Sequence, residues 1–172
     1  MKKNKEVLSI FIRYLLIILA GLGDLFIFYK IFTTPTIFLV KNILNLISPV
    51  TSLGNIILFN SFPIQLVSAC IAGAAYYLLF ILIMSTPKIK TIKRIELIFL
   101  SFALFLIINV IRIVILSLTL NFSYFNLLHE VFWYALSTLF VIGIWFLCAR
   151  LFKIKTVPVY SDIKELYLIT KN

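Results

Sequence analysis

Long apolar runs, separated by short polar segments, dominate the pattern of hydrophobic and polar positions along this chain. Four such runs cover about residues 7–32, 66–85, 95–120 and 131–152. A helix needs roughly 20 apolar residues to cross a hydrocarbon core of about 30 Å, so each run is long enough. The first run contains Arg13 and Asp24, and Pro87 closes the second. We therefore predict an all-α integral membrane protein with about four transmembrane helices, forming a single membrane domain over residues 1–172.

Residues 33–65, between the first two runs, are apolar but interrupted by polar side chains. Within residues 37–48 the polar side chains fall on one helical face: Lys41, Asn42, Asn45 and Ser48. That spacing predicts an amphipathic helix lying at the outer membrane interface. Further on, residues 56–59 and 62–67 flank Asn60-Ser61, a pattern that predicts a short hairpin.

The amino-acid composition supports a membrane protein and affects how the net positive charge is interpreted. Hydrophobic residues make up 63% of the chain and charged residues 13%, against about 45–50% and about 25% in soluble domains. Sixteen Lys and Arg oppose six acidic residues, for a formal net charge of +10. Such an excess can indicate nucleic-acid binding, but that requires a solvated basic face. Here the basic residues lie between apolar runs, so we expect no nucleic-acid partner.

The basic residues instead predict an orientation. They form three clusters next to the apolar runs: Lys2, Lys3 and Lys5; Lys88, Lys90, Lys93 and Arg94; and Arg150, Lys153 and Lys155. With four spans all three clusters lie on one side, which the positive-inside rule makes cytoplasmic. Both termini are then cytoplasmic in a plasma membrane, and segments 33–65 and 121–130 face outward. The first run is too long for the core of a cleavable signal peptide. Residues 153–172 are predicted to be a cytoplasmic tail with no assigned role.

Three residues with reactive side chains reach the same outer membrane level in this arrangement. Cys70 lies near the start of the second run, and His129 lies just before the fourth. Arg112 follows Ile95 by seventeen residues, about 26 Å along a helix that rises 1.5 Å per residue. Cys148, the other cysteine, falls at the inner end of the fourth run. One histidine and one thiol are too few for a typical zinc site, so we expect neither a metal nor another cofactor.

Each of the three residues also has a structural explanation when taken alone. A cysteine packs in an apolar helix as a small hydrophobe, and an arginine near a helix end can extend its charge to the headgroups. Together, however, a thiol, a guanidinium that stabilises its thiolate and an imidazole that acts as its base equip a cysteine acyl-transfer enzyme.

Three further residues are predicted to support this site. Gly73 lies three residues after Cys70 and lets a neighbouring helix approach closely. Asn109 precedes Arg112 by three residues, so its amide could orient the guanidinium or donate to an oxyanion. Asp24 reaches the same outer depth, where it pairs with Arg112, orients His129 or lies in the headgroup layer.

The segments that carry these residues resemble the exosortase/archaeosortase family of membrane cysteine transpeptidases. The matching segments are Ala69-Cys70-Ile71-Ala72-Gly73, Asn109-Val110-Ile111-Arg112 and His129, in the family's order and on consecutive runs. Many members have Cys-Ser-Gly where this chain has Cys-Ile-Ala-Gly, and many are longer. The resemblance is nearest to a minimal archaeal-type member.

The resemblance implies a function and a role for each residue. The substrates would be proteins with a C-terminal tripartite sorting signal, cut near its motif and transferred to a membrane lipid or amine acceptor for anchoring at the cell surface. Cys70 would be the nucleophile, Arg112 the partner of the thiolate or oxyanion, and His129 the general acid/base. Two alternatives need none of this chemistry: a non-catalytic substrate-binding subunit of a membrane transporter, and a structural subunit of a larger membrane assembly.

Overall fold

The computed structural model describes the backbone of residues 2–60 and 62–171, and the side chains of residues 6–60, 62–134 and 138–168. Most of the described chain is helical, with one small antiparallel sheet. The helices are α1 (Lys2–Gly21), α2 (Phe26–Asn45), α3 (Ser68–Ile71), α4 (Gly73–Met84), α5 (Thr91–Leu118), α6 (Phe125–Tyr134), the π-helical turn η1 (Ala135–Phe140), α7 (Val141–Leu151) and α8 (Tyr160–Lys171). The strands are β1 (Val50–Leu53), β2 (Ile56–Phe59) and β3 (Phe62–Gln65), in the order β1-β2-β3.

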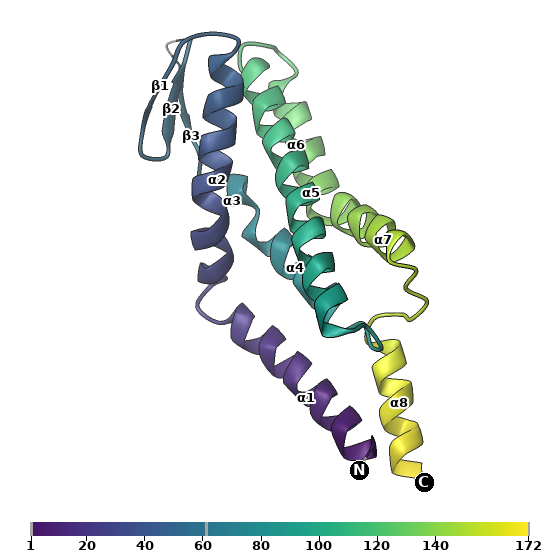
Figure 1. Ribbon diagram of the computed structural model, residues 1–172. Coiled ribbons are helices and arrows are strands. Elements are labelled where there is room, and N and C mark those ends of the chain that lie inside the picture. Colours follow the sequence, from purple (N-terminus) through teal and green to yellow (C-terminus); the bar gives the residue numbers. More distant parts are fainter. Residues whose placement is uncertain (1, 61, 172) are drawn as a thin grey trace.

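Two of the described helices, α2 and α5, are long and apolar enough to cross a membrane. They pack against each other in the part of the molecule nearer the sheet (Figure 1). The bent segment formed by α6, η1 and α7 would be a third span, with a bend of 42° between its halves. The prediction of a mainly helical chain with apolar helices of membrane-spanning length is therefore confirmed, whereas four transmembrane helices are not.

Three of the predicted spans differ from the structure because helices end inside apolar runs. The run over residues 131–152 contains the end of α6, the turn η1 and α7. The run over residues 7–32 is divided between α1 and α2, since Gly23, Asp24 and Leu25 adopt positive φ values of 67°, 53° and 63°. The first of these three residues is a glycine, the residue type that enters this backbone region most easily. The run over residues 66–85 is divided between α3 and α4 at Ala72. By contrast, the predicted span over residues 95–120 is the single helix α5.

The segment after the first run also differs from its prediction. Residues 37–45 are the second half of α2 rather than a separate interfacial helix. Their polar side chains serve the junction between this helix and the sheet: Asn45 Oδ1 accepts from the Val50 amide at 3.1 Å, and Ser48 Oγ donates to Asn60 Oδ1 at 2.8 Å. The predicted hairpin is confirmed as the β2–β3 pair, and β1 extends it to three strands. Ser61, which lies between β2 and β3 in the sequence, is outside the described residues.

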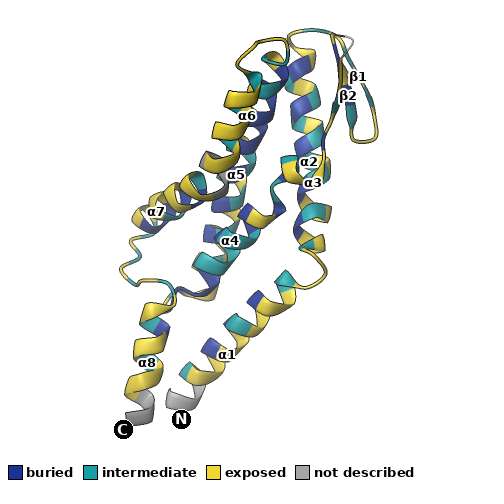
Figure 2. Ribbon diagram, turned by 180° about the vertical axis from the view of Figure 1, so that it is seen from behind, coloured by how far each residue is buried: buried dark blue, intermediate teal, exposed yellow. Residues whose placement is uncertain are grey.

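Two groups of buried side chains hold these elements together. Phe28, Phe32, Tyr76 and Phe105 lie among the side chains that join α2, α4, α5 and α7, with the Phe32 and Tyr76 rings stacked at 3.6 Å between centroids. A second group joins the C-terminal halves of α2 and α5 to the sheet and includes Val40, Leu44, Ile57 and Val110. Figure 2 shows buried positions on the facing sides of α2 and α5, whereas α1 and α8 are largely exposed. The sheet and the segment that follows it are thereby fixed against α5.

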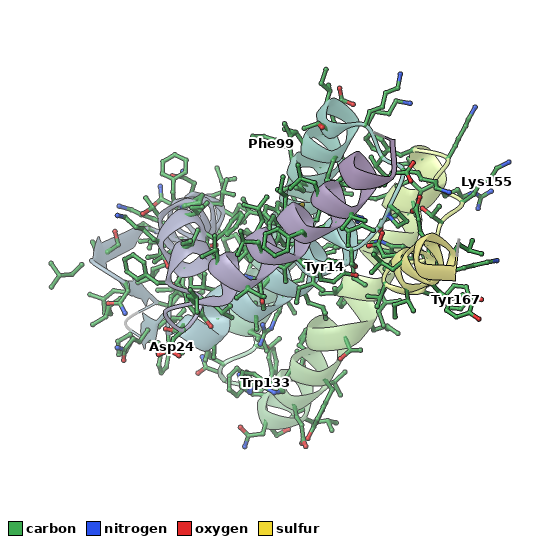
Figure 3. The ribbon with its side chains drawn as sticks, turned by 90° about the horizontal axis from the view of Figure 1, so that it is seen from below. Tyr14, Asp24, Phe99, Trp133, Lys155 and Tyr167 are labelled. Atoms are coloured by element: carbon green, nitrogen blue, oxygen red, sulfur yellow. The ribbon has the colours of Figure 1, made fainter. Side chains whose placement is uncertain are left out.

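The last helix, α8, is attached to the first one, which the prediction of an unassigned tail missed. Asp162 on α8 accepts hydrogen bonds from Arg13 Nη2 at 2.6 Å and from Arg13 Nη1 at 2.9 Å. Both side chains are buried, and Tyr14, which is labelled in Figure 3, also donates to Asp162 at 3.3 Å. The two ends of the chain therefore lie together at the end of the molecule remote from the sheet (Figure 1).

Candidate active site

Cys70 lies in α3, a helix of only four residues that begins three residues after β3. Ala72 follows this helix with a left-handed backbone, φ 59° and ψ 43°, and α4 then starts in a new direction at Gly73. This conformation costs an alanine roughly 1–2 kcal/mol, so the surrounding packing must maintain it. The chain therefore turns two residues after Cys70. As a result the half-buried thiol does not lie on the same helical face as the side chains of α4, as it would in an unbroken helix.

Asn109 holds the end of this short helix in place. Its fully buried amide nitrogen donates to the carbonyl oxygen of Cys70 at 2.8 Å, with a longer contact of 3.4 Å to that of Ile71. Carbonyl groups at a helix end lack partners within the helix, and the side chain of α5 supplies one. The amide therefore positions the backbone at Cys70. The sequence spacing had suggested that it orients the Arg112 guanidinium or donates to an oxyanion, whereas its described hydrogen bonds go to the carbonyls of Cys70 and Ile71.

Arg112 lies one turn after Asn109 on the same helix and is only 4% exposed. Within the described residues its Nε is buried and has no hydrogen-bond partner. Arg112 and Cys70 line one common cavity. A buried donor without a partner costs about 1–3 kcal/mol, and a charged donor costs more, so this group is prepared to bind an acceptor that enters from outside.

His129 is contributed by a third element, α6, on the other side of α5. Its imidazole lies between Phe125 and Trp133, with ring centroids separated by 6.0 and 6.4 Å. The ring is accessible from outside the fold. These aromatic neighbours limit the orientations of the imidazole without removing it from solvent.

A cavity of about 160 Å³ brings the three side chains together. Cys70, Arg112 and His129 all line it, although they belong to α3, α5 and α6. Gln65 and Ser117 are its other polar lining residues, and the remaining wall is apolar: Ile64, Leu66, Ile113, Leu116, Leu120 and Phe125. An apolar cavity of about 150 Å³ holds one benzene molecule, so this space accepts a single side chain beside the thiol.

Arg112 also lines a second, larger cavity of about 420 Å³. Tyr29 of α2 and Trp133 of α6 lie at this cavity, together with small and apolar side chains of α3 and α4: Ser68, Ala69, Ala72, Ala74, Ala75 and Leu78. A Cβ atom on Gly73 would lie 2.7 Å from two ring carbons of Tyr29. The close approach predicted for Gly73 is therefore present, and its partner is the Tyr29 ring.

Two residues considered from the sequence lie away from this site. Asp24 is exposed in the turn between α1 and α2, as Figure 3 shows, and it lines neither cavity. No ion pair joins it to Arg112 or His129 within the described part of the chain. Cys148 is buried in the core on α7.

Three other residues enter the site without having been singled out in the sequence. Of these three, Gln65 could have been noticed in the sequence, because it is a polar residue at the end of the apolar strand β3. Tyr29 and Trp133 are aromatic residues within apolar runs, and nothing in their spacing distinguishes them from core residues.

Comparison with known proteins adds no relative to this description. No protein-family model, curated protein or solved structure matches the chain. A functional proposal therefore depends on the chemistry of the two adjoining cavities and on the resemblance of the short segments around Cys70, Arg112 and His129.

Proposed function

We propose that this protein is a membrane-embedded cysteine peptidase and transpeptidase, with Cys70 as its nucleophile. The observation that carries the proposal is the shared cavity, in which a thiol, an arginine with an unpartnered donor and an imidazole meet from three separate elements. Their positions are 42 and 17 residues apart in the sequence, so local chain geometry does not bring them together.

Each side chain has its own role in the proposed reaction, which begins as His129 takes the proton of the Cys70 thiol. The Cys70 thiolate attacks a peptide carbonyl carbon, and the Nε–H of Arg112 donates a hydrogen bond to the oxyanion that forms. The carbon–nitrogen bond breaks as His129 gives a proton to the departing amine, which leaves the carbonyl carbon as a thioester on Cys70. An amine or hydroxyl acceptor then loses a proton to His129 and attacks the thioester, which releases the thiolate.

The surroundings of the thiol favour transfer to an acceptor over hydrolysis. Six apolar side chains form most of the wall of the 160 Å³ cavity, so once a substrate side chain occupies it there is little room for water. Asn109 keeps the Cys70 backbone fixed during the reaction, because its amide already bonds to that carbonyl. We therefore assign Asn109 a positioning role and the oxyanion to Arg112.

We place the site at the outer face of the plasma membrane, with both termini in the cytoplasm. The support is the distribution of the chain between the two ends of the molecule. The α4–α5 turn, the segment after α7 and both termini lie at the end remote from the sheet (Figure 1). The described basic residues Lys88, Lys90, Lys93, Lys153 and Lys155 belong to that end. The positive-inside rule makes it the cytoplasmic one.

The proposed substrates are surface proteins that end in a tripartite sorting signal, and the proposed acceptor is a membrane lipid or an amine. This choice is supported by the resemblance of three segments to the exosortase/archaeosortase family. A cavity beside the apolar helix α5 that accepts one side chain also fits a substrate delivered by a hydrophobic helix in the same bilayer.

Processing of a co-expressed protein with a tripartite signal tests the proposal. Wild type should shorten the substrate by its C-terminal signal, and Cys70→Ala should abolish the shortening because no thioester forms. Cys148→Ala is the matched control, since that thiol is buried in the core and lines neither cavity. Continued processing by Cys70→Ala, judged by substrate mass, would contradict the proposed function.

A further inference from the structure

A third cavity, of about 540 Å³, lies at the opposite end of the molecule from the sheet, between α1, α4 and α5. One face of α1 forms a long wall, with Ser9, Arg13 and Leu16 at spacings of four and three residues. The rest of the lining is mainly apolar: Leu8 and Ile12 of α1, Phe80 and Met84 of α4, and Thr91, Arg94, Ile95 and Ile98 of α5. We refer to this space as the inner groove.

The walls of the inner groove leave apolar surface exposed. Leu8, Ile12 and Ile95 are 56%, 45% and 59% exposed within the described structure. A contiguous apolar patch of this kind on a chain with membrane-length helices is suited to hydrocarbon contact. The groove therefore provides a surface along which an acyl chain can lie.

Two arginines lie in the same groove, and their charges are balanced differently. Arg13 is fully engaged, because its guanidinium bonds to both carboxylate oxygens of Asp162 and to the Met84 carbonyl at 2.9 Å. Arg94 donates from Nη2 to the Thr86 carbonyl at 2.8 Å, and its buried Nε has no partner within the described residues. The described ion pair involves Arg13 and Asp162 only. One positive charge at Arg94 is therefore left without a bonded counter-charge.

We propose that the inner groove binds an anionic phospholipid, with the phosphate at Arg94 and one acyl chain along α1 and α5. Basic pockets between membrane helices on the cytoplasmic side are suited to anionic headgroups, and a guanidinium donates well to phosphate oxygens. A zwitterionic lipid carries its own ammonium and does not compensate the charge of Arg94. A free phosphate ion would leave the apolar walls uncovered. The site is independent of the chemistry proposed at Cys70.

Lipid binding to the purified full-length protein in detergent tests this assignment. Native mass spectrometry, with phosphatidylglycerol and phosphatidylcholine of the same acyl chains, gives the affinity for each lipid. Phosphatidylglycerol should bind wild type more tightly, and Arg94→Gln should weaken its binding about fivefold to tenfold, as expected for one arginine at a lipid surface. Arg94→Lys should retain most of the affinity. Arg150→Gln is the matched control, because Arg150 is exposed and does not line the groove.

A second variant keeps the test decisive if Arg94→Gln fails to fold. Ser9→Trp fills the groove from α1 without altering either arginine, and it should also reduce phosphatidylglycerol binding. The proposal is overturned if both lipids bind equally, or if neither Arg94→Gln nor Ser9→Trp lowers the affinity. It is also overturned if inorganic phosphate at millimolar concentration displaces the lipid from wild type, because the apolar walls would then contribute nothing.

Discussion

At the residue scale, the environment of Cys70 depends on a small number of polar contacts. Asn109 fixes the carbonyl of Cys70, while Arg112 lines the same cavity as the thiol and has a buried Nε with no partner among the described residues. The shared cavity of Cys70, Arg112 and His129 agrees with the common depth predicted for them, because a helix converts residue number into distance along its axis. The direction in which each side chain points from its helix could not be predicted, because depth along a helix does not determine the rotation of that helix about its axis. Asp24 illustrates the difference: its predicted depth suggested a role, but it is exposed in a turn.

Gly73 packs so closely against the Tyr29 ring that a larger residue at this position should be destabilising. Gly73→Ala places a Cβ atom 2.7 Å from the Tyr29 ring, so α2 or the ring must move. Such overpacking should lower the free energy of unfolding by about 1–3 kcal/mol and reduce substrate processing. Thermal unfolding in detergent, together with the processing assay, measures both effects.

Gly143→Ala is the matched control for this change. A Cβ atom on Gly143, inside α7, meets nothing within 4 Å, and alanine is the better helix former by about 0.5–1 kcal/mol. It should leave stability unchanged or slightly raised. Equal destabilisation by the two substitutions would show that the contact between Gly73 and Tyr29 has no special role.

At the scale of elements, the apolar pattern predicted where helices occur better than where they end. The run over residues 95–120 has neither glycine nor proline, and it corresponds closely to α5. The runs over residues 7–32 and 66–85 are equally apolar, but each contains glycine and each breaks at residues with positive φ. Leu25 and Ala72 are residue types that rarely adopt this backbone, so tertiary packing imposes it at these two positions. The hairpin was predictable because its turn is polar between two apolar strands.

The pairing of α1 with α8 was not predictable from the pattern, because Arg13 and Asp162 are 149 residues apart. Asp162→Asn leaves the Arg13 guanidinium buried without its counter-charge, so it should lower the free energy of unfolding by about 3–5 kcal/mol. Glu165→Gln, on the same helix, should change it by less than about 0.5 kcal/mol. Thermal or denaturant unfolding measures both variants.

A double-mutant cycle identifies the ion pair as the cause. The variant with both Arg13→Gln and Asp162→Asn should lose less stability than the sum of the two single changes, because it contains no unpaired buried charge. Strict additivity would mean that Arg13 and Asp162 stabilise the fold independently of each other.

At the scale of the whole molecule, the sheet lies at one end and both termini lie at the other, with α3 between the sheet and α4 (Figure 1). In a background of Cys70→Ser and Cys148→Ala, a membrane-impermeant thiol reagent can report on each end through one added cysteine. Leu53→Cys in β1 and Val157→Cys before α8 replace side chains that are 82% and 55% exposed. Intact cells should label Leu53→Cys only, and lysed cells should label both. Labelling of Val157→Cys in intact cells would contradict the proposed orientation.

Hydroxylamine trapping measures most directly whether Cys70 forms a thioester in the cavity that it shares with Arg112 and His129. Hydroxylamine attacks a thioester carbonyl and releases the acyl group as a hydroxamic acid, which mass spectrometry distinguishes from a carboxylic acid at the new C-terminus of the substrate. Wild-type membranes supplied with a tripartite-signal substrate should yield the hydroxamate, Cys148→Ala should do the same, and Cys70→Ala should yield none. A cleaved substrate that carries only a free carboxylate in the presence of hydroxylamine, or a hydroxamate that persists in Cys70→Ala, would contradict the assignment of Cys70 as the nucleophile.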